Sequence, residues 1–152
     1  NIAQIIAAVP VITTASDSYG EYYNIQSPEN LVLGIGCRKG LKPEDIERAV
    51  TIMLWDEKIP LSRVVCAATI DVKKNDIGLL GFATAHKLEI DFYTSAQLNG
   101  VIGKFSSSQR VLDRVGVDNV CERAAVLRGE KGRLIMGKKA LNGVTTAVFE
   151  KE

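Results

Sequence analysis

Hydrophobic and polar positions follow one another along the chain in blocks that predict strands and helices in turn. The continuous apolar run at 31–36 ends in glycines, as expected of a buried strand that enters a tight turn. Pro43 and two acidic residues then begin a segment whose apolar residues recur at helical spacing through Leu54. The pattern predicts a strand followed by a helix that packs one face on a sheet.

The same alternation continues to residue 128. Further strands are expected at 62–70 and 89–93, and a polar turn over 71–76 follows the first of them. A serine-rich loop is expected over 100–108. Short helices are expected around 79–86 and at 95–98, 109–115 and 120–128.

The chain closes with two strand-like segments, 132–136 and 144–150, which we expect to form a hairpin joined through 138–143. The whole pattern predicts a three-layer α/β/α domain with a mixed, mostly parallel sheet and a C-terminal antiparallel strand pair. Sites in such sheets form beyond the carboxyl ends of the strands. The loops at 34–43, 71–77 and 94–108 are therefore the places to look for one.

The N-terminal part has a different character. Residues 9–14 are mostly β-branched, with Pro10 near the start, and predict a strand, whereas 17–30 are polar and are interpreted as a linker. The chain begins without Met, and residues 1–8 look like the end of a helix already under way. We therefore interpret 1–30 as a remnant of an upstream domain plus a linker, and 31–152 as the α/β domain.

Composition narrows the function classes. The chain has 152 residues and a formal net charge of +1, which argues against a nucleic acid or an acidic membrane as the main partner. No apolar stretch reaches the roughly 18 residues of a membrane span. Cys37, Cys66 and Cys121 lie far apart, with no C-x-x-C and no paired His. This usage favours a reducing cytoplasm over a disulfide framework or a zinc site.

Glycines and cations between the first strand and the first helix form one candidate site. Gly34, Gly36 and Gly40 would let backbone N–H groups approach an anion, and Arg38 could hold a carboxylate with two hydrogen bonds. The spacing is not G-x-G-x-x-G, so nucleotide binding is weakly supported. A tight turn with solvated basic residues explains the pattern equally well.

Two other segments carry charged residues near predicted strand or helix ends. Lys73 follows a strand, where a cation can meet a carboxylate or a developing oxyanion. Asp76 and Glu122 stand at helix starts, and capping is the favoured interpretation for both, since Glu122 follows Asn119 by three as in a capping box. A buried thiol is expected at Cys121.

Three basic or titratable positions have simple structural interpretations. His86 is expected as a packed histidine on the apolar face of a helix. Lys138 and Lys139 are expected in the solvated turn of the final hairpin.

Three segments in order resemble one family, the C-terminal domain of the cobalt-precorrin-5A hydrolases. They are G-I-G-C-R-K-G at 34–40, I-D-V-K through G-L at 70–79, and V-C-E-R-A-A-V-L at 120–127, followed by Lys138 and V-T-T-A-V at 144–148. The resemblance covers 31–150. The family has Glu where this chain has Asp76, whose carboxylate has a shorter reach. Residues 10–17 look like the tail of the preceding domain in the same hydrolases.

The resemblance implies an enzyme that opens the δ-lactone of cobalt-precorrin-5A and expels acetaldehyde. It implies that Gly34, Gly36, Arg38, Gly40 and Lys138 hold the carboxylate-fringed ring. Lys73 would stabilise the oxyanion, and Glu122 or Asp76 would act as base or orienting carboxylate. No cofactor or protein-bound metal is implied, because cobalt arrives inside the substrate.

Two alternatives stay open. The chain is either the hydrolase domain or a non-catalytic module that binds a corrin intermediate while another domain performs the chemistry. A nucleotide-binding regulatory domain is less favoured. A homodimer is left open by the sequence.

Overall fold

One five-stranded sheet organises the part of the chain that the computed structural model describes, residues 28–152. The expected strand at 9–14 and most of the expected linker lie outside these residues. The strands are β1 (Leu31–Cys37), β2 (Val64–Ile70), β3 (Glu89–Tyr93), β4 (Gly132–Leu141) and β5 (Val144–Lys151). The helices are α2 (Pro43–Asp56), α3 (Ile77–Ala85), α4 (Ser95–Asn99), α5 (Gln109–Val115) and α6 (Val120–Gly129).

The sheet is mixed, with the strand order β3-β2-β1-β5-β4. β1 pairs in parallel with β2, and β2 with β3, so their carboxyl ends lie at one edge. β5 runs antiparallel between β1 and β4. The predicted α/β class, with a C-terminal antiparallel strand pair, is confirmed.

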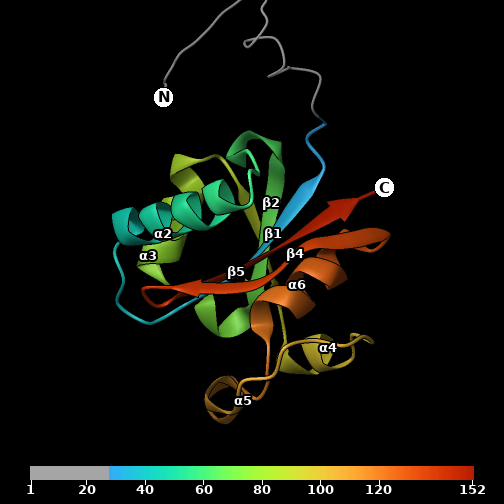
Figure 1. Ribbon diagram of the computed structural model, residues 1–152. Coiled ribbons are helices and arrows are strands. Elements are labelled where there is room, and N and C mark those ends of the chain that lie inside the picture. The colour runs from blue at the N-terminus through green and yellow to red at the C-terminus, as the bar shows by residue number, and fades with distance from the viewer. Residues whose placement is uncertain (1–27) are drawn as a thin grey trace, which may run out of the picture.

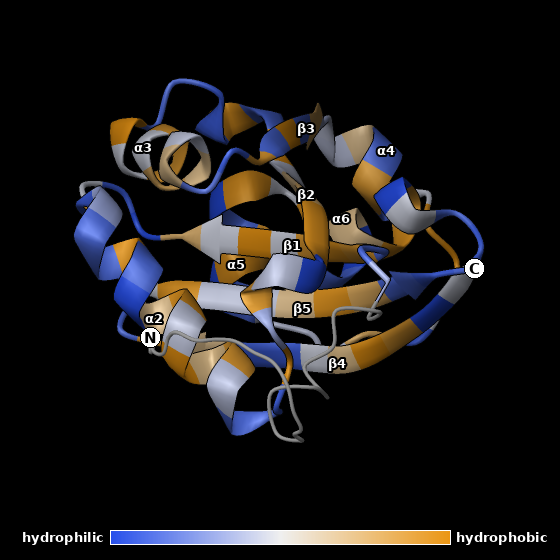
Figure 2. Cartoon of the chain, turned by 90° about the horizontal axis from the view of Figure 1, so that it is seen from above, coloured by the Kyte–Doolittle hydropathy of each residue, from blue (hydrophilic) through white to orange (hydrophobic). Residues whose placement is uncertain are grey.

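Helices cover both faces of the sheet. α2 and α3 lie on one side and α4 and α6 on the other (Figure 1, Figure 2). β1 is buried from both sides because its successive side chains point to opposite faces. Leu33 packs in the core under α2 and α3, whereas Val32 packs in the core under α6, and neither is exposed to solvent. This double burial explains the unbroken apolar run that the sequence shows at β1.

The final hairpin differs from its prediction. β4 continues to Leu141, so the expected turn over 138–143 is wrong, and Lys138 and Lys139 lie in the strand. The turn consists of Asn142 and Gly143, whose φ angles are 50° and 83°. Asn-Gly with two positive φ angles is the favoured two-residue hairpin turn. Lysines remain solvated on an edge strand, so their polarity does not mark a turn.

β4 shifts its register against β5 twice, between Leu134 and Met136 and again between Met136 and Lys139, and the second shift lies beside Lys138. Met136 pairs with Val148 and Lys139 with Thr146, so three steps along β4 match two along β5. Such a bulge leaves a backbone group of the longer strand without a ladder partner. The N–H of Lys138 donates instead to the side-chain carboxylate of Glu122.

No helix among residues 28–152 combines the length and apolarity needed to cross a membrane.

Candidate functional site

Two adjoining cavities open at the carboxyl ends of the parallel strands β1 and β2. Their volumes are about 500 and 900 Å³. Arg38, Lys73, Arg114 and Val115 line both of them, so we treat the two as one feature, the cationic cleft. Its position beyond the carboxyl ends of parallel strands is where sites of α/β sheets form.

The charge of the cleft is strongly one-sided. Asp76 is its only lining carboxylate among the described residues. The cationic side chains that line it are Arg38, Lys39, Lys42, Lys73, Arg110, Arg114 and Lys138. Within residues 28–152, Lys73 is the one member of this set that forms an ion pair. Uncompensated cations along a hollow surface create a positive potential that attracts anions.

The loop after β1 is tied to the final hairpin. The N–H of Arg38 donates to the carbonyl of Gly143 at 2.7 Å. The Arg38 side chain packs over Gly143, since a Cβ there would lie 3.0 Å from the guanidinium carbon. Gly40 has φ +88°, which gives the turn its left-handed residue. Gly36 and Arg38 line the smaller cavity, while Arg38 and Gly40 line the larger.

Lys73 and Asp76 form a largely buried ion pair after β2. The Nζ of Lys73 lies 3.7 Å from Oδ2 of Asp76, and their side chains are 16% and 10% exposed. Oδ1 of Asp76 accepts the N–H of Leu79 at 2.9 Å and caps α3. The predicted capping role of Asp76 is confirmed. The other carboxylate oxygen remains directed at Lys73.

Cys37, the last residue of β1, lies next to the Asp76 carboxylate of this pair. Its Sγ lies 4.0 Å from Oδ2 of Asp76. Burial raises the pKa of the Cys37 thiol to about 11, although the nearby Lys73 charge lowers it and Asp76 raises it further. The thiol is therefore neutral at physiological pH and is not an activated nucleophile.

Glu122 lies behind the wall of the cleft and does not line it. The side chain is 5% exposed. Oε1 accepts the N–H of Ser106 at 3.1 Å and the amide of Asn119 at 2.8 Å. Oε2 accepts the N–H of Lys138, the residue at the β4 bulge, at 2.6 Å. Lys138 itself lines the smaller cavity, so Glu122 supports that wall from inside.

The predicted cap at the start of α6 is present with one change of partner. Asn119 is the N-cap, and its Oδ1 accepts the N–H of Glu122 at 2.9 Å. The Glu122 carboxylate returns to the Asn119 side chain rather than to its backbone. Cys121 is fully buried, and burial raises the pKa of its thiol to about 12, as expected of a packed thiol.

Gly34 has a packing role away from the cleft. A Cβ at this position would clash with the backbone carbonyl of Cys121 and crowd Ala125. The missing side chain lets α6 approach β1 closely. Neither cavity of the cleft is lined by Gly34, unlike Gly36 and Gly40.

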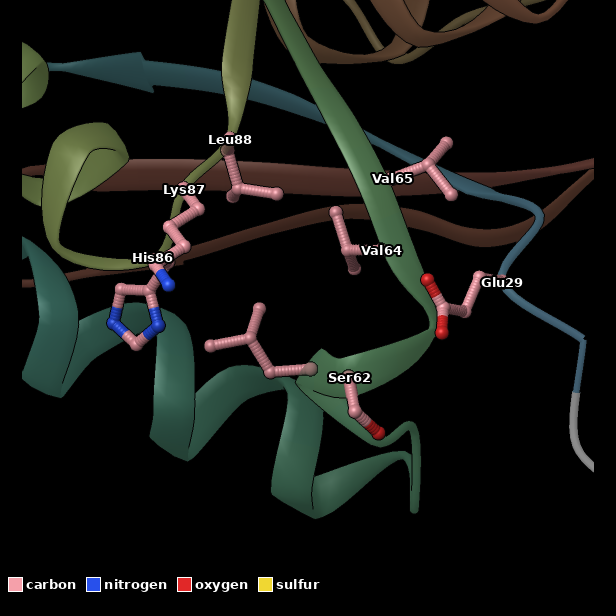
Figure 3. A pocket seen from close by; sticks show the side chains of 8 residues that line it. Glu29, Ser62, Val64, Val65, His86, Lys87 and Leu88 are labelled. Atoms are coloured by element: carbon pink, nitrogen blue, oxygen red, sulfur yellow. The ribbon is translucent and has the colours of Figure 1, made fainter. Parts of the chain in front are cut away.

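A third cavity, of about 610 Å³, lies at the opposite end of the strands, where β2 and β3 begin (Figure 3). Leu61, Val64 and Leu88 give it an apolar lining. His86 follows α3 as its C-cap and lies against Phe82, with ring centroids 5.1 Å apart. The predicted packed histidine is thus half-buried at a helix end. The cations of the cleft do not gather here, so this cavity is the weaker candidate site.

Sequence reasoning missed Arg110 and Arg114 of α5, which line the cleft. They follow a serine-rich loop in a short helix and match no motif. Their spacing of four was the available signal, because it places both on one side of a helix. Nowhere in residues 28–152 do three or more His, Cys, Asp or Glu side chains group as a metal site, and the three cysteines are free and buried.

Comparison with known proteins shows the same family throughout the described domain. The family described as cobalamin synthesis G C-terminus matches residues 31–149. The chain is 30% identical over 121 residues to the cobalt-precorrin-5A hydrolase of Priestia megaterium, covering 80% of this chain and 32% of that protein. It is 30% identical over 131 residues to a probable cobalt-precorrin-5A hydrolase of Methanocaldococcus jannaschii, covering 80% and 41%. The chain thus spans well under half the length of these relatives.

Two solved structures share the fold over nearly their whole length. CobE, a protein from the cobalamin (vitamin B12) biosynthetic pathway, superposes with a TM-score of 0.74 at 26% identity, covering 81% of this chain and 91% of CobE. The cobalamin biosynthesis protein chiG from Agrobacterium tumefaciens gives 0.63 at 28% identity, covering 80% and 98%. The chain belongs to the cobalamin synthesis G C-terminal family and has a role in cobalamin biosynthesis.

Proposed function

We propose that this chain is the C-terminal domain of a cobalt-precorrin-5A hydrolase and that its cationic cleft holds the substrate ring. The observation that carries the proposal is the concentration of cations at one sheet edge, with Asp76 as the single lining carboxylate among the described residues. A macrocycle fringed with carboxylates complements such a surface. The relatives named as hydrolases support the reaction. Three free, buried thiols suit a cytoplasmic protein.

The reaction we propose for the whole protein is the opening of the substrate's δ-lactone by water, with loss of acetaldehyde. In this proposal Arg38 binds a ring carboxylate, and Lys73 stabilises the oxyanion that forms at the lactone carbonyl. Asp76 holds the Lys73 ammonium through its Oδ2, 3.7 Å away. Cobalt enters and leaves as part of the substrate.

Asp76 is a better candidate base than Glu122. Both oxygens of the Glu122 carboxylate already accept hydrogen bonds from the protein, and the side chain lies outside the cleft lining. Asp76 lines the larger cavity and keeps one oxygen free of backbone donors. A water activated at this oxygen would stand beside Lys73.

A second candidate function is corrin binding without chemistry in this domain. It is favoured by the engagement of both candidate carboxylates, Asp76 in a helix cap and Glu122 in a buried network. The fold also makes up nearly all of CobE and chiG. The lactone would then be opened on another domain.

Acetaldehyde release by the full-length protein that contains this chain tests the choice. We expect Lys73→Ala to lower kcat on the order of a hundredfold, as loss of an oxyanion donor does. Asp76→Asn should lower it too, and the distant Arg48→Gln should have no effect. If both cleft variants raise KM and leave kcat unchanged, the domain binds the ring and the chemistry lies elsewhere.

A further inference from the structure

Helix α5 projects beyond the carboxyl edge of the sheet, below the ends of β1 and β2 (Figure 1). Val111 and Val115 pack it against the core under α6. The N–H of Ser108, its N-cap, donates to the carbonyl of Asp118 at 3.1 Å. The helix therefore has a fixed seat, and one side of it faces the cationic cleft.

That side carries two arginines. Arg110 and Arg114 are four residues apart and line the smaller cavity together, and Arg114 reaches the larger one as well. The one acid of α5, Asp113, accepts a hydrogen bond from Gln109 at 2.8 Å. In the described part of the chain, neither arginine forms an ion pair.

Like charges at this spacing destabilise a helix. Here the repulsion is increased by further cations in the same cavity, Arg38, Lys73 and Lys138. Surface arginines are usually free to turn toward acids, and these two instead line a cavity wall without one. Both arginines are exposed to solvent, and an anion held between them and the other cations of the cavity would relieve this repulsion.

The rim of the larger cavity is apolar where the cations leave space. Val72 and Ile77 line it and are 64% and 81% exposed. Such side chains gain by covering a flat apolar surface. The lining of the cleft thus combines cations from several elements with exposed apolar side chains.

We propose that Arg110 and Arg114 form the second wall of a two-sided carboxylate clamp that opposes Arg38 and Lys73. The clamp selects flat ligands with ionised carboxylates on two edges. It rejects the same ring with esterified or amidated side chains, because these carry no negative charge to pair with guanidinium and ammonium groups, and an amide N–H would also face only donors. This inference rests on the proposed function and adds the wall that sets specificity.

Binding of cobyrinic acid, a cobalt corrin with free carboxylates, and of its heptamethyl ester to the 152-residue chain tests the clamp. We expect the chain to bind the acid and to bind the ester far more weakly. The double variant Arg110→Gln/Arg114→Gln should weaken binding of the acid about tenfold or more and leave the ester unchanged. The double variant Arg48→Gln/Arg133→Gln removes the same charge on remote surfaces and should bind like the wild type.

The outcomes separate the clamp from the proposed function. If the wild type binds neither ligand, both fail. If Arg38→Gln and Lys73→Ala lose the acid while Arg110→Gln/Arg114→Gln binds it normally, the clamp alone is wrong. Should the glutamine variant fold poorly, Arg110→Lys/Arg114→Lys keeps the charge and loses the paired hydrogen bonds. The clamp predicts weaker binding for it, and wild-type binding would overturn the proposal.

Discussion

Single residues in this domain divide into those that shape the cleft and those that support it. Gly34 and Gly36 are two positions apart in β1 but have different surroundings. Gly34 touches α6 through its Cα, whereas Gly36 lines the smaller cavity beside Thr145. Sequence pattern could not separate them, because both follow from the same glycine-rich run.

The packing role of Gly34 predicts a large stability effect. Gly34→Ala should lower the free energy of unfolding by about 3 kcal/mol, because the added methyl must push α6 off β1. Gly40→Ala is the matched control. Its φ of +88° costs about 1 kcal/mol, and no atom crowds the new methyl. Urea unfolding of both variants checks this, and an equal or smaller loss for Gly34→Ala would contradict it.

Buried thiols predict a loss of stability at high pH. Burial raises the pKa of Cys37 from 9.0 to about 11, and that of Cys121 from 9.0 to about 12. The folded state therefore holds these protons more tightly than the unfolded state. Their contribution is complete below pH 9 and is lost as pH rises toward the folded pKa.

Urea unfolding at pH 8 and pH 10 measures this effect. Between these pH values the wild type should lose about 1 kcal/mol per buried thiol more than the Cys37→Ala/Cys121→Ala variant, because one pKa unit corresponds to that energy. The comparison removes the background from Lys and Tyr, which both proteins share. Equal losses in the two proteins would show that the thiols titrate normally.

At the scale of elements, the carboxylate of Glu122 joins three segments. It binds the loop that leads to α5, the cap of α6 and the bulge of β4. Each of these segments borders or supports the cleft. A buried carboxylate with N–H donors on both oxygens explains why the β4 bulge occurs where it does.

Loss of that carboxylate should loosen all three segments. Glu122→Gln replaces an acceptor with a donor, and we expect a loss of about 2 kcal/mol of unfolding free energy. Amide hydrogen exchange at Ser106 and Lys138 should accelerate in the same variant, while the exposed Glu130→Gln leaves both unchanged. Unaltered stability and exchange would mean that Glu122 is free for another role.

Most elements were predictable because their hydrophobic periods match single rules. The strand at 31–36, the helix that begins at Pro43 and the caps at Asp76 and Asn119 all appear as expected. The hairpin turn differs from the expected 138–143, because Lys138 and Lys139 belong to β4 and the Asn-Gly pair at 142–143 alone forms the turn. The bulge depends on Glu122, sixteen residues away from Lys138, and no local pattern reveals it.

At the scale of the whole molecule, charge is distributed far less evenly than the net value of +1 suggests. Cations collect at the carboxyl edge, while acids such as Glu44 and Glu47 lie on α2. The placement of Arg38 and Lys73 at the same site was predictable from strand topology, because parallel strands have their carboxyl ends on the same side of the sheet. The arginines of α5 were not, since a loop without a sequence signature places that helix.

Binding to this edge should depend on ionic strength. Affinity for cobyrinic acid should fall on the order of tenfold between low and physiological salt, because screening weakens exposed ion pairs. Isothermal titration at several salt concentrations measures the slope. The Arg110→Gln/Arg114→Gln variant should show a shallower slope than the wild type, and an identical slope would remove α5 from the charge complement.

NMR chemical-shift mapping of the 152-residue chain with cobyrinic acid is the most direct measurement. We predict that perturbed amides cluster at 36–42, 70–77, 108–115 and 138–143, around the cationic cleft. Amides near Leu61 and His86, at the cavity of the opposite strand ends, should not move. A perturbed set centred on that opposite cavity, or no perturbation anywhere, would contradict the assignment of corrin binding to the cleft.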